Sequence, residues 1–569
     1  MAQNTAADAL VRCLESEGVE RVFGIPGEET LDLSRALDRS DIQFIPVRHE
    51  QAGAYMANVV GRLTGRAGVC LTTLGPGATN TTTAIADAFL DRAPLVLLTG
   101  QSGLERMHKE SHQYIDVIGM MRPITKWNAR VSEPGVIPEV VRKAFKVAEA
   151  EKPGPTHLEL PEDVMAAPLE AAPLPRRSTP PGAPPDSEIA RAAGLIMRAA
   201  SPVILAGNGV VRGRAAAALR DFAHATGIGV AETFMAKGVL DADDPLSRGA
   251  VGLQAGDYRL AGFAEADLVL AVGFDLVEHS PRNWNPNRDK LIVCIDSMPA
   301  EIDECFIPEV ELAGDISEIL QHLSRSSAGR PQGEASTPLQ DSVRDRIQGA
   351  PQDPDRPLQP VRVLYEIRQA MGPRDILVSD VGLHKLWIGR VFPAHEPGTC
   401  LIANGLAAMG FAVPAAIAAK LVHPDRKVVQ VSGDGGFMMN AQDLETAVRL
   451  KTAFVSVVWE NNQFGSIVWK QMSRFGTHFG TNFGNPDFVA FAASFGMPAP
   501  GAPTTASPRP KGSFSPAPSG WPSASPSRGT SRPPGRSSTT PRAPATTSAS
   551  SPKSGIRPPC TCSATSPRP

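Results

Sequence analysis

The sequence predicts an α/β protein with three doubly wound, parallel-sheet domains and a disordered tail. Short β-branched runs alternate with helical segments through most of the chain, which is typical of parallel sheets covered by helices on both faces. Proline-containing stretches interrupt this pattern twice, and 569 residues are too many for one core. The predicted domains and connections are 1–170, a linker at 171–186, 187–323, a linker at 324–357, 358–498 and a tail at 499–569.

Composition and charge narrow the class of protein. The formal net charge of −3 gives no reason to expect a nucleic acid or an anionic membrane as partner. The seven cysteines lie scattered, without metal-ligand spacing in the globular part, which is typical of reduced thiols. The N-terminus lacks the apolar core of a signal peptide, and the longest apolar segment, Gly405–Leu421, contains Pro414 and fits a buried helix. We therefore expect a cytoplasmic protein without a transmembrane segment.

The first predicted domain contains two loops of interest at strand ends. Its expected strands are Ile42–Val47, Val69–Leu74, Leu95–Thr99 and Thr156–Leu160. Glu50 follows the first strand and opens an alanine-rich helix, where the positive end of the helix dipole would explain an isolated carboxylate. Leu74–Asn80 opens another helix, and its glycines and proline also suit an ordinary turn.

The second predicted domain resembles a small nucleotide-binding sheet only in its general pattern. Its buried-strand candidates, set between helices, are Pro202–Ala206, Leu268–Val272 and Lys290–Ile295. Gly207-Asn208-Gly209 follows the first of these, but it is too short to be a dinucleotide fingerprint. We expect a Rossmann-like sheet without a recognisable ligand motif.

The third predicted domain carries the most informative stretch, a single β-α-β unit. It begins with a helix at Val361–Met371 and a strand at Ile376–Ser379. Further on, the strand Lys427–Ser432 runs into Gly433-Asp434-Gly435-Gly436, and Asn440 is expected to open a helix with Asp443 in its first turn. Ala453–Trp459 is the second strand of the unit.

This unit predicts a metal and phosphate site. A right-handed crossover makes its strands parallel, so Asp434 and Asn461 leave the sheet at the same carboxyl edge, where open α/β sheets bind ligands. A carboxylate, an amide oxygen and the backbone carbonyl near Gln463 form a hard oxygen set suited to Mg²⁺. Gly435 and Gly436 expose backbone N–H groups that suit a diphosphate. A plain glycine turn is the alternative, and the spacing of Asp434 and Asn461 disfavours it.

The motif Gly433-Asp434-Gly435 followed by Asn461-Asn462 resembles the signature of thiamine diphosphate enzymes. The resemblance implies that Asp434, Asn461 and the carbonyl of Gln463 hold Mg²⁺ on the cofactor's diphosphate, with the glycines Gly433, Gly435 and Gly436 around it. Asn461 is preferred over Asn462 as the ligand because Phe464-Gly465 fixes the register of the family's loop.

Further motifs extend the resemblance to the rest of the cofactor. Arg48–Gln51 and Leu74–Asn80 are similar to family loops, implying that Glu50, supplied by the partner subunit of a dimer or tetramer, activates the aminopyrimidine and that Gly77 contacts the cofactor. His384 would contact the diphosphate, the Ala407 carbonyl would accept a bond from the aminopyrimidine, and Met409 would wedge between the rings. Without the resemblance, a histidine at a strand end also suits a cap, and a methionine suits the core.

Two segments resemble acetolactate synthases, most closely the catabolic, flavin-free type. They are Glu110–Asp116, in which Gln113 would line the substrate pocket and serve catalysis, and Pro123–Lys126. Gly273–His279 departs from the arginine-bearing pattern of flavin-containing relatives, which disfavours FAD. The implied activity decarboxylates pyruvate on thiamine diphosphate and transfers the two-carbon unit to a second 2-oxo acid. Another thiamine diphosphate-dependent decarboxylase, lyase or oxidase is the alternative, and the acceptor and the catabolic or biosynthetic role stay open.

The resemblance stops near Pro498. Residues 500–569 contain no Asp, Glu, Leu or Val but seven Arg and two Lys, a composition that cannot build a core and predicts disorder. An appended basic tail is one reading. We favour a frameshift, because the family's third domain continues with further strands and a helix where the composition changes. An inactive cofactor-binding remnant is therefore a further alternative.

Overall fold

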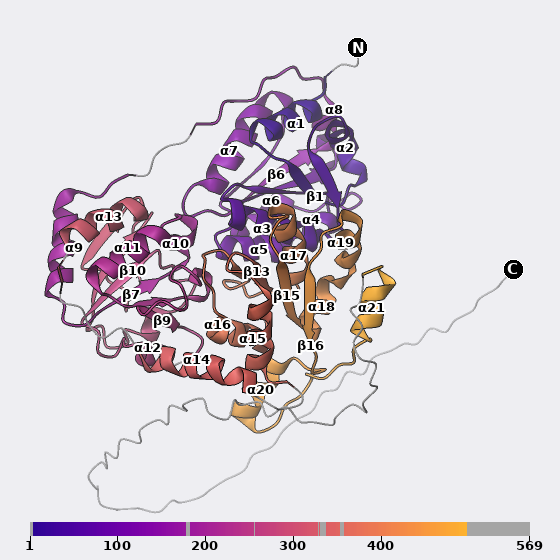
Figure 1. Cartoon of the computed structure of the whole chain (residues 1–569). Coiled ribbons are helices and arrows are strands. Elements are labelled where there is room, and N and C mark those ends of the chain that lie inside the picture. The colour runs from indigo at the N-terminus through magenta and orange to yellow at the C-terminus, as the bar shows by residue number, and fades with distance from the viewer. Residues whose placement is uncertain are drawn as a thin grey trace, which may run out of the picture. The chain divides into compact units, whose positions relative to one another are not determined.

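Three parallel sheets organise the part of the chain that the structure describes (Figure 1). This computed structural model describes residues 4–497 except 178–181, 255, 328, 331–336 and 353–357. Every strand pair within the three sheets is parallel, as alternating strands and helices predict. The predicted tail at 499–569 lies outside the described residues. Within the described ranges, each helix is too short or too polar to cross a lipid bilayer.

The first sheet has the strand order β2-β1-β3-β4-β6-β5. Its strands are β1 (Arg21–Gly24), β2 (Gln43–Pro46), β3 (Gly68–Thr72), β4 (Leu95–Gln101), β5 (Trp127–Arg130) and β6 (Pro155–Pro161). Its helices are α1 (Ala6–Ser16), α2 (Leu31–Asp38), α3 (Glu50–Thr64), α4 (Pro76–Asn80), α5 (Thr82–Leu90), α6 (Val117–Met121), α7 (Ile137–Glu149) and α8 (Glu162–Ala166). The four expected strands are present, and β1 and β5 are additional short strands that weak local patterns did not reveal.

The second sheet has the order β12-β11-β10-β7-β8-β9, so the order in which strands are added reverses between β10 and β7. Its strands are β7 (Pro202–Ala206), β8 (Val230–Glu232), β9 (Ser247–Ala250), β10 (Leu268–Val272), β11 (Leu291–Asp296) and β12 (Val310–Ala313). Its helices are α9 (Asp186–Arg198), α10 (Asn208–Arg212), α11 (Ala216–Thr226), α12 (Asp257–Leu260) and α13 (Ile316–Ser326). The expected Rossmann-like sheet is therefore present.

The stretch 324–357, expected as a linker, contains a helix, α14 (Pro338–Gly349). The side chain of Thr337 caps its first turn by accepting a hydrogen bond from Gln340 N at 3.4 Å. Leu339 and Val343 are buried on one face of the helix. The sequence did not predict this helix because only one narrow face of the helix is apolar and the rest of the stretch is polar.

The third sheet has the order β14-β13-β15-β16. Its strands are β13 (Ile376–Ser379), β14 (Cys400–Ile402), β15 (Val428–Gly433) and β16 (Val455–Trp459). Its helices are α15 (Pro360–Ala370), α16 (Leu383–Val391), α17 (Ala412–Val422), α18 (Asp434–Asn440), α19 (Leu444–Leu450), α20 (Gly465–Phe475) and α21 (Phe488–Ser494). β16 forms one edge of this sheet, and Val455 on it is 59% exposed.

The crossover helix of the β15–β16 unit begins earlier than the sequence indicated. We expected it to open at Asn440, but α18 begins at Asp434, directly after the strand, and Asn440 ends it. The Asn440 side chain donates to the Gly410 carbonyl at 2.8 Å, a long-range bond that local patterns cannot predict. A short 3₁₀ turn ending at Asp443 then leads into α19.

The first and third domains share one apolar core. Helices α3 and α17 lie against each other, and their buried small and aromatic side chains belong to a single cluster. The Tyr55 and Phe411 rings meet edge to face, with centroids 5.5 Å apart. This packing fixes the loops at the carboxyl edges of both sheets.

Candidate functional site

Asp434 lies at the centre of the β15–α18 turn. Its carboxylate is 2% exposed and accepts a hydrogen bond from Gly435 N at 2.9 Å. Asn461 N and Asn462 N, which follow β16, donate to its Oδ2 at 2.9 and 2.6 Å. Because β15 and β16 are parallel and Gly433 pairs with Trp459, these groups meet at one sheet edge, as predicted.

The two asparagines after β16 face different partners. Asn461 Oδ1 accepts from Gln463 N at 3.1 Å, whereas Asn462 Oδ1 accepts from Asn485 Nδ2 at 3.0 Å. Asn485 Nδ2 also donates to Asp434 Oδ2 at 2.9 Å, a contact that the sequence analysis missed. No local motif marks Asn485, which lies far along the chain from Asp434. The donor set of Asp434, Asn461 and the nearby backbone carbonyl of Gln463 matches the hard oxygen ligands of Mg²⁺.

Three glycines line this turn, and the space beside them tightens from Gly433 through Gly435 to Gly436. A Cβ at Gly436 would lie 2.8 Å from Asp380 Oδ2, and one at Gly435 would lie 3.0 Å from the Phe464 ring. A Cβ at Gly433 would lie 3.4 Å from the His384 ring. The strand-to-helix turn therefore presents bare backbone of the kind that accommodates a phosphate group.

His384 is buried beside this turn in the first turn of α16. It is 3% exposed, and its ring packs against that of Trp459 with centroids 6.2 Å apart. Burial lowers the pKa of His384 to about 4, so the imidazole is neutral near pH 7. Among the described residues, its Nε2 has no hydrogen-bond partner. A buried ring nitrogen without a partner fits a bound polar group such as a diphosphate oxygen.

The loop at 404–411 follows β14 and lies near the same edge. Ala407 has a φ of 55°, in the left-handed region that non-glycine residues rarely adopt, and Met409 is half-buried. Gly410 N donates to Asp380 Oδ1 at 3.0 Å. Burial raises the pKa of Asp380 to about 6, although its backbone hydrogen bonds act in the opposite direction. Asp380, which no sequence motif marks as a site residue, connects this loop with β13 and α18.

In the first domain, Glu50 and Gln113 lie around the loop that follows β3. Asn80 Nδ2 donates to Glu50 Oε2 at 2.9 Å, and a Cβ at Gly77 would lie 3.7 Å from Glu50 Oε1. A Cβ at Gly75 would lie 2.6 Å from the Gln113 carbonyl oxygen. Glu50 is buried at the N-terminus of α3. The loop thus brings the predicted residues of this domain together.

The two groups of predicted residues share no direct bond in the described part of the chain. Among the described residues, no hydrogen bond or ion pair joins Glu50 or Gln113 to Asp434, Asn461 or His384. The first group comes from loops of the first domain, and the second comes from strand ends of the third.

The middle domain has a backbone contact and ion pairs at the point where its strand order reverses. Gly209 N, after β7, donates to the carbonyl of Gly273, after β10, at 2.8 Å. Next to them, Asp275 forms ion pairs with Arg92 at 2.8 Å and with Lys152 at 3.4 Å. Although burial acts to raise it, these cations lower the pKa of Asp275 to about 2. A backbone contact and an ion-pair network thus lie at the point where the strand order reverses, the usual ligand position in such sheets.

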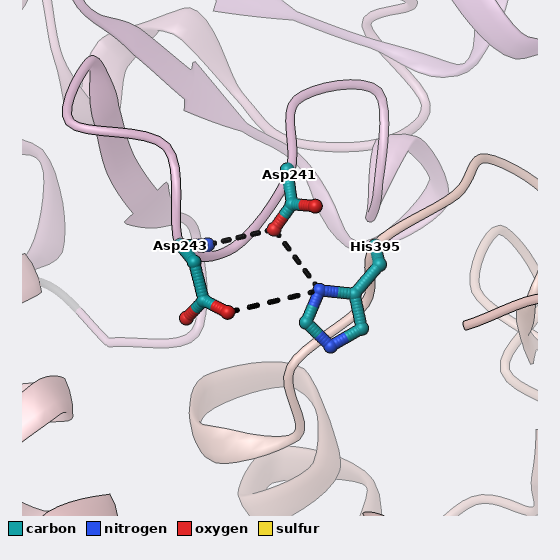
Figure 2. A group of neighbouring side chains, drawn as sticks. All are labelled: Asp241, Asp243 and His395. Atoms are coloured by element: carbon teal, nitrogen blue, oxygen red, sulfur yellow. Dashed lines mark hydrogen bonds and ion pairs between the residues drawn. The ribbon is translucent and has the colours of Figure 1, made fainter. Parts of the chain in front are cut away.

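A separate cluster contains Asp241, Asp243 and His395 (Figure 2). His395 Nδ1 lies 3.0 Å from Asp241 Oδ1 and 4.0 Å from Asp243 Oδ2. Asp243 N donates to Asp241 Oδ1 at 2.9 Å, and the Asp243 side chain is 86% exposed. These mutual contacts describe a hydrogen-bonded cluster that joins the second and third domains and contains none of the predicted site residues.

The three domains correspond in order to three family descriptions. Residues 4–120 match the N-terminal TPP binding domain of thiamine pyrophosphate enzymes, residues 189–323 match their central domain, and residues 380–510 match their C-terminal TPP binding domain. Thiamine pyrophosphate is another name for thiamine diphosphate.

Full-length relatives agree with the domain matches. The chain is 35% identical over 506 residues to acetolactate synthase of Bacillus subtilis (strain 168), covering 87% of this chain and 88% of that protein. It is 36% identical over 503 residues to the catabolic acetolactate synthase of Raoultella terrigena, covering 86% of this chain and 89% of that protein. It is 34% identical over 502 residues to acetolactate synthase isozyme 1 large subunit of Escherichia coli (strain K12), covering 87% of this chain and 88% of that protein. The chain therefore belongs to the thiamine pyrophosphate enzyme family, in its acetolactate synthase-like branch.

Proposed function

We propose that this protein decarboxylates pyruvate and transfers the resulting two-carbon unit to a second 2-oxo acid, forming an acetolactate-type product. The observation that carries this proposal is the meeting of Asp434, Asn461 and the unpartnered Nε2 of His384 at one sheet edge, in a chain about a third identical to acetolactate synthases. Bound thiamine diphosphate supplies a carbon nucleophile and an electron sink for decarboxylation.

In this proposal, the third domain holds the cofactor's diphosphate and metal. Asp434, Asn461 and the carbonyl of Gln463 would bind Mg²⁺, and the backbone of the glycine turn would approach the phosphate oxygens. His384 Nε2 would donate to a phosphate oxygen if the neutral ring carries its proton on that nitrogen.

The 404–411 loop would hold the other end of the cofactor in the same domain. The carbonyl of Ala407 would accept a hydrogen bond from the aminopyrimidine, and Met409 would fill the space between the two rings. The left-handed φ of Ala407 supports this assignment, because strained backbone conformations cluster at ligand sites.

Glu50 would share a proton with a ring nitrogen of the aminopyrimidine, and Gly77 would let the cofactor approach beside it. Asn80 supports this role because it fixes one carboxylate oxygen, Oε2, at 2.9 Å in a buried position. A shielded carboxyl group that can accept and return a proton suits general acid/base catalysis. Gln113, beside the same loop, would line the pocket for the 2-oxo acid.

We further propose that two copies of the chain form each site. Glu50 of the partner subunit would complete the site built around Asp434, which is consistent with the absence of a hydrogen bond or ion pair between these groups in the described part of one chain. A two-fold dimer, alone or within a tetramer, gives two equivalent sites.

The proposed activity does not use FAD. The departure of Gly273–His279 from the arginine-bearing pattern of flavin-containing relatives supports this, and Asp275 of that segment pairs with Arg92 of the same chain at 2.8 Å. This arrangement agrees with a flavin-free, catabolic-type protein, although identities to catabolic and large-subunit relatives are similar, at 36% and 34%.

Product analysis tests the proposal. The full chain is incubated with pyruvate, thiamine diphosphate and Mg²⁺, and acetolactate is measured as acetoin after acidification. Acetoin that depends on both cofactor and metal is expected. Acetaldehyde or acetate without acetolactate would indicate another enzyme of the family. A folded protein that binds the cofactor without turnover would indicate an inactive remnant, for which the exposed edge strand β16 is the structural reason.

A further inference from the structure

The first domain holds the 404–411 loop of the third domain through a buried carboxylate. Asp91, which follows α5, accepts hydrogen bonds from Asn404 N at 3.1 Å and from Gly405 N at 2.6 Å. The Asp91 side chain is almost fully buried. A negative charge is unfavourable at the C-terminal end of a helix, where Asp91 lies. The hydrogen bonds to the loop therefore explain the presence of Asp91 at this position better than an interaction with the helix dipole.

A second carboxyl group, Asp87, lies one helical turn before Asp91. It is fully buried and accepts from Asn58 Nδ2 at 3.3 Å. Burial raises the pKa of Asp87 well above its usual value, and repulsion from Asp91 adds to this shift, whereas Arg62 and the backbone N–H of Ala408 act in the opposite direction. Asp87 thus adds a second buried acid beside Asp91.

Two cations complete this buried group. Arg62 Nη1 lies 3.5 Å from Asp91 Oδ2 and donates to the Ile402 carbonyl at 3.0 Å. Lys385 Nζ donates to the Ala403 carbonyl at 2.9 Å and to Asn404 Oδ1 at 3.1 Å. Asp91 therefore accepts from backbone N–H groups of the segment, and the cations donate to carbonyl groups at its start.

The loop also packs tightly against the end of α5. A Cβ at Gly405 would lie 2.6 Å from Leu90 Cβ and 2.8 Å from its backbone carbon. The close approach leaves no room for a side chain, so the hydrogen bonds to Asp91 depend on glycine at this position.

We propose that Asp91 is a positioning residue that holds the 404–411 loop of its own chain in the shape that binds the cofactor. This inference rests on the proposed function, in which Ala407 and Met409 contact thiamine diphosphate. The first domain then contributes to two cofactor sites, each through a different surface. The end of α5 shapes the loop of its own third domain, while Glu50 at the start of α3 completes the site of the partner subunit.

Hydrogen–deuterium exchange on the full chain without cofactor tests the positioning. Asp91→Asn keeps the shape of the side chain but removes its charge and one acceptor, and Asp38→Asn is the control because Asp38 is exposed at the end of α2. In Asp91→Asn, exchange of the 402–411 amides should accelerate about tenfold or more, with exchange in the middle domain unchanged. The affinity for thiamine diphosphate with Mg²⁺ should fall about tenfold or more.

Exchange of the 402–411 amides equal to that of the control would overturn the inference, as would acceleration spread evenly over all three domains. Faster loop exchange with an unchanged affinity would also overturn it, because the loop would then be held for another purpose. If the wild-type chain does not bind thiamine diphosphate at all, the proposed function fails, and the exchange result alone still decides whether Asp91 holds the loop.

Gly405→Ala provides a second variant should Asp91→Asn not fold. It leaves every charge in place and displaces the loop from Leu90. The same local acceleration is expected, and a loop that exchanges as in wild type would count against the inference.

Discussion

Replacing Gly436 with alanine should weaken cofactor binding more than it weakens the fold. The added Cβ would lie 2.8 Å from Asp380 Oδ2, whereas ordinary contacts begin at 3.4 Å. Asp380 cannot retreat freely, because its carboxylate accepts from Val381 N at 2.7 Å and Gly410 N at 3.0 Å. Overpacking costs about 1–3 kcal/mol and the helix propensity of alanine offsets about 1 kcal/mol, so the free energy of unfolding should fall by about 2 kcal/mol at most.

The same clash displaces Gly410 and the loop that holds the aminopyrimidine end of the cofactor. We therefore expect the affinity for thiamine diphosphate to fall about tenfold or more, measured by isothermal titration calorimetry with excess Mg²⁺ beside denaturant unfolding. Gly135→Ala is the control, because nothing lies within 4 Å of a Cβ at that position. Equal affinities in the two variants would refute the reasoning that Asp380 couples α18 to the loop.

Glu50→Gln should retain cofactor binding while exchange of the cofactor's C2 proton, followed by NMR, slows about 10²–10⁴-fold, and unchanged exchange would remove Glu50 from the reaction. Mixing Glu50→Gln with Asp434→Ala chains should restore activity in heterodimers, whereas heterodimers that form but stay inactive would contradict the shared site. Burial lowers the pKa of His384 from 6.5 to about 4. As the pH falls from 6.5 towards 4, the unfolded chain binds a proton on this ring that the folded chain does not, so the free energy of unfolding decreases. His384→Gln should remove that loss, about 3 kcal/mol in denaturant titrations across this range, and an unchanged pH profile would argue against it. Translating the DNA after codon 498 in the other two frames should recover an apolar-patterned continuation if the frameshift hypothesis holds, and two frames without one would exclude it.

The parts of the site that local sequence could predict are those carried by one β-α-β unit. The meeting of Asp434 and Asn461 follows from the crossover rule, since parallel strands end at the same edge. The placement of Glu50 and His384 at the starts of α3 and α16 follows from strand-end patterns in the same way.

The parts that escaped prediction depend on contacts between distant residues. Asn485 reaches Asp434 from beyond α20, and Asp91 reaches the 404–411 loop from another domain. Neither the hydrophobic periodicity nor the spacing of motifs in the sequence predicts such contacts. The start of α18 was misplaced for the same reason, because Asn440 ends that helix while bonded to Gly410.

Calorimetric titration of the full chain with thiamine diphosphate, with Mg²⁺ or with EDTA, tests the central claim most directly. Wild type and the control Asp38→Asn should bind one cofactor per chain in Mg²⁺ and lose most of that affinity in EDTA. Asp434→Ala should not bind measurably, because it removes the carboxylate that anchors the metal and accepts from Asn461 and Asn462. Binding by Asp434→Ala equal to wild type, or no binding by a folded wild-type chain, would contradict the assignment of this sheet edge as the cofactor site.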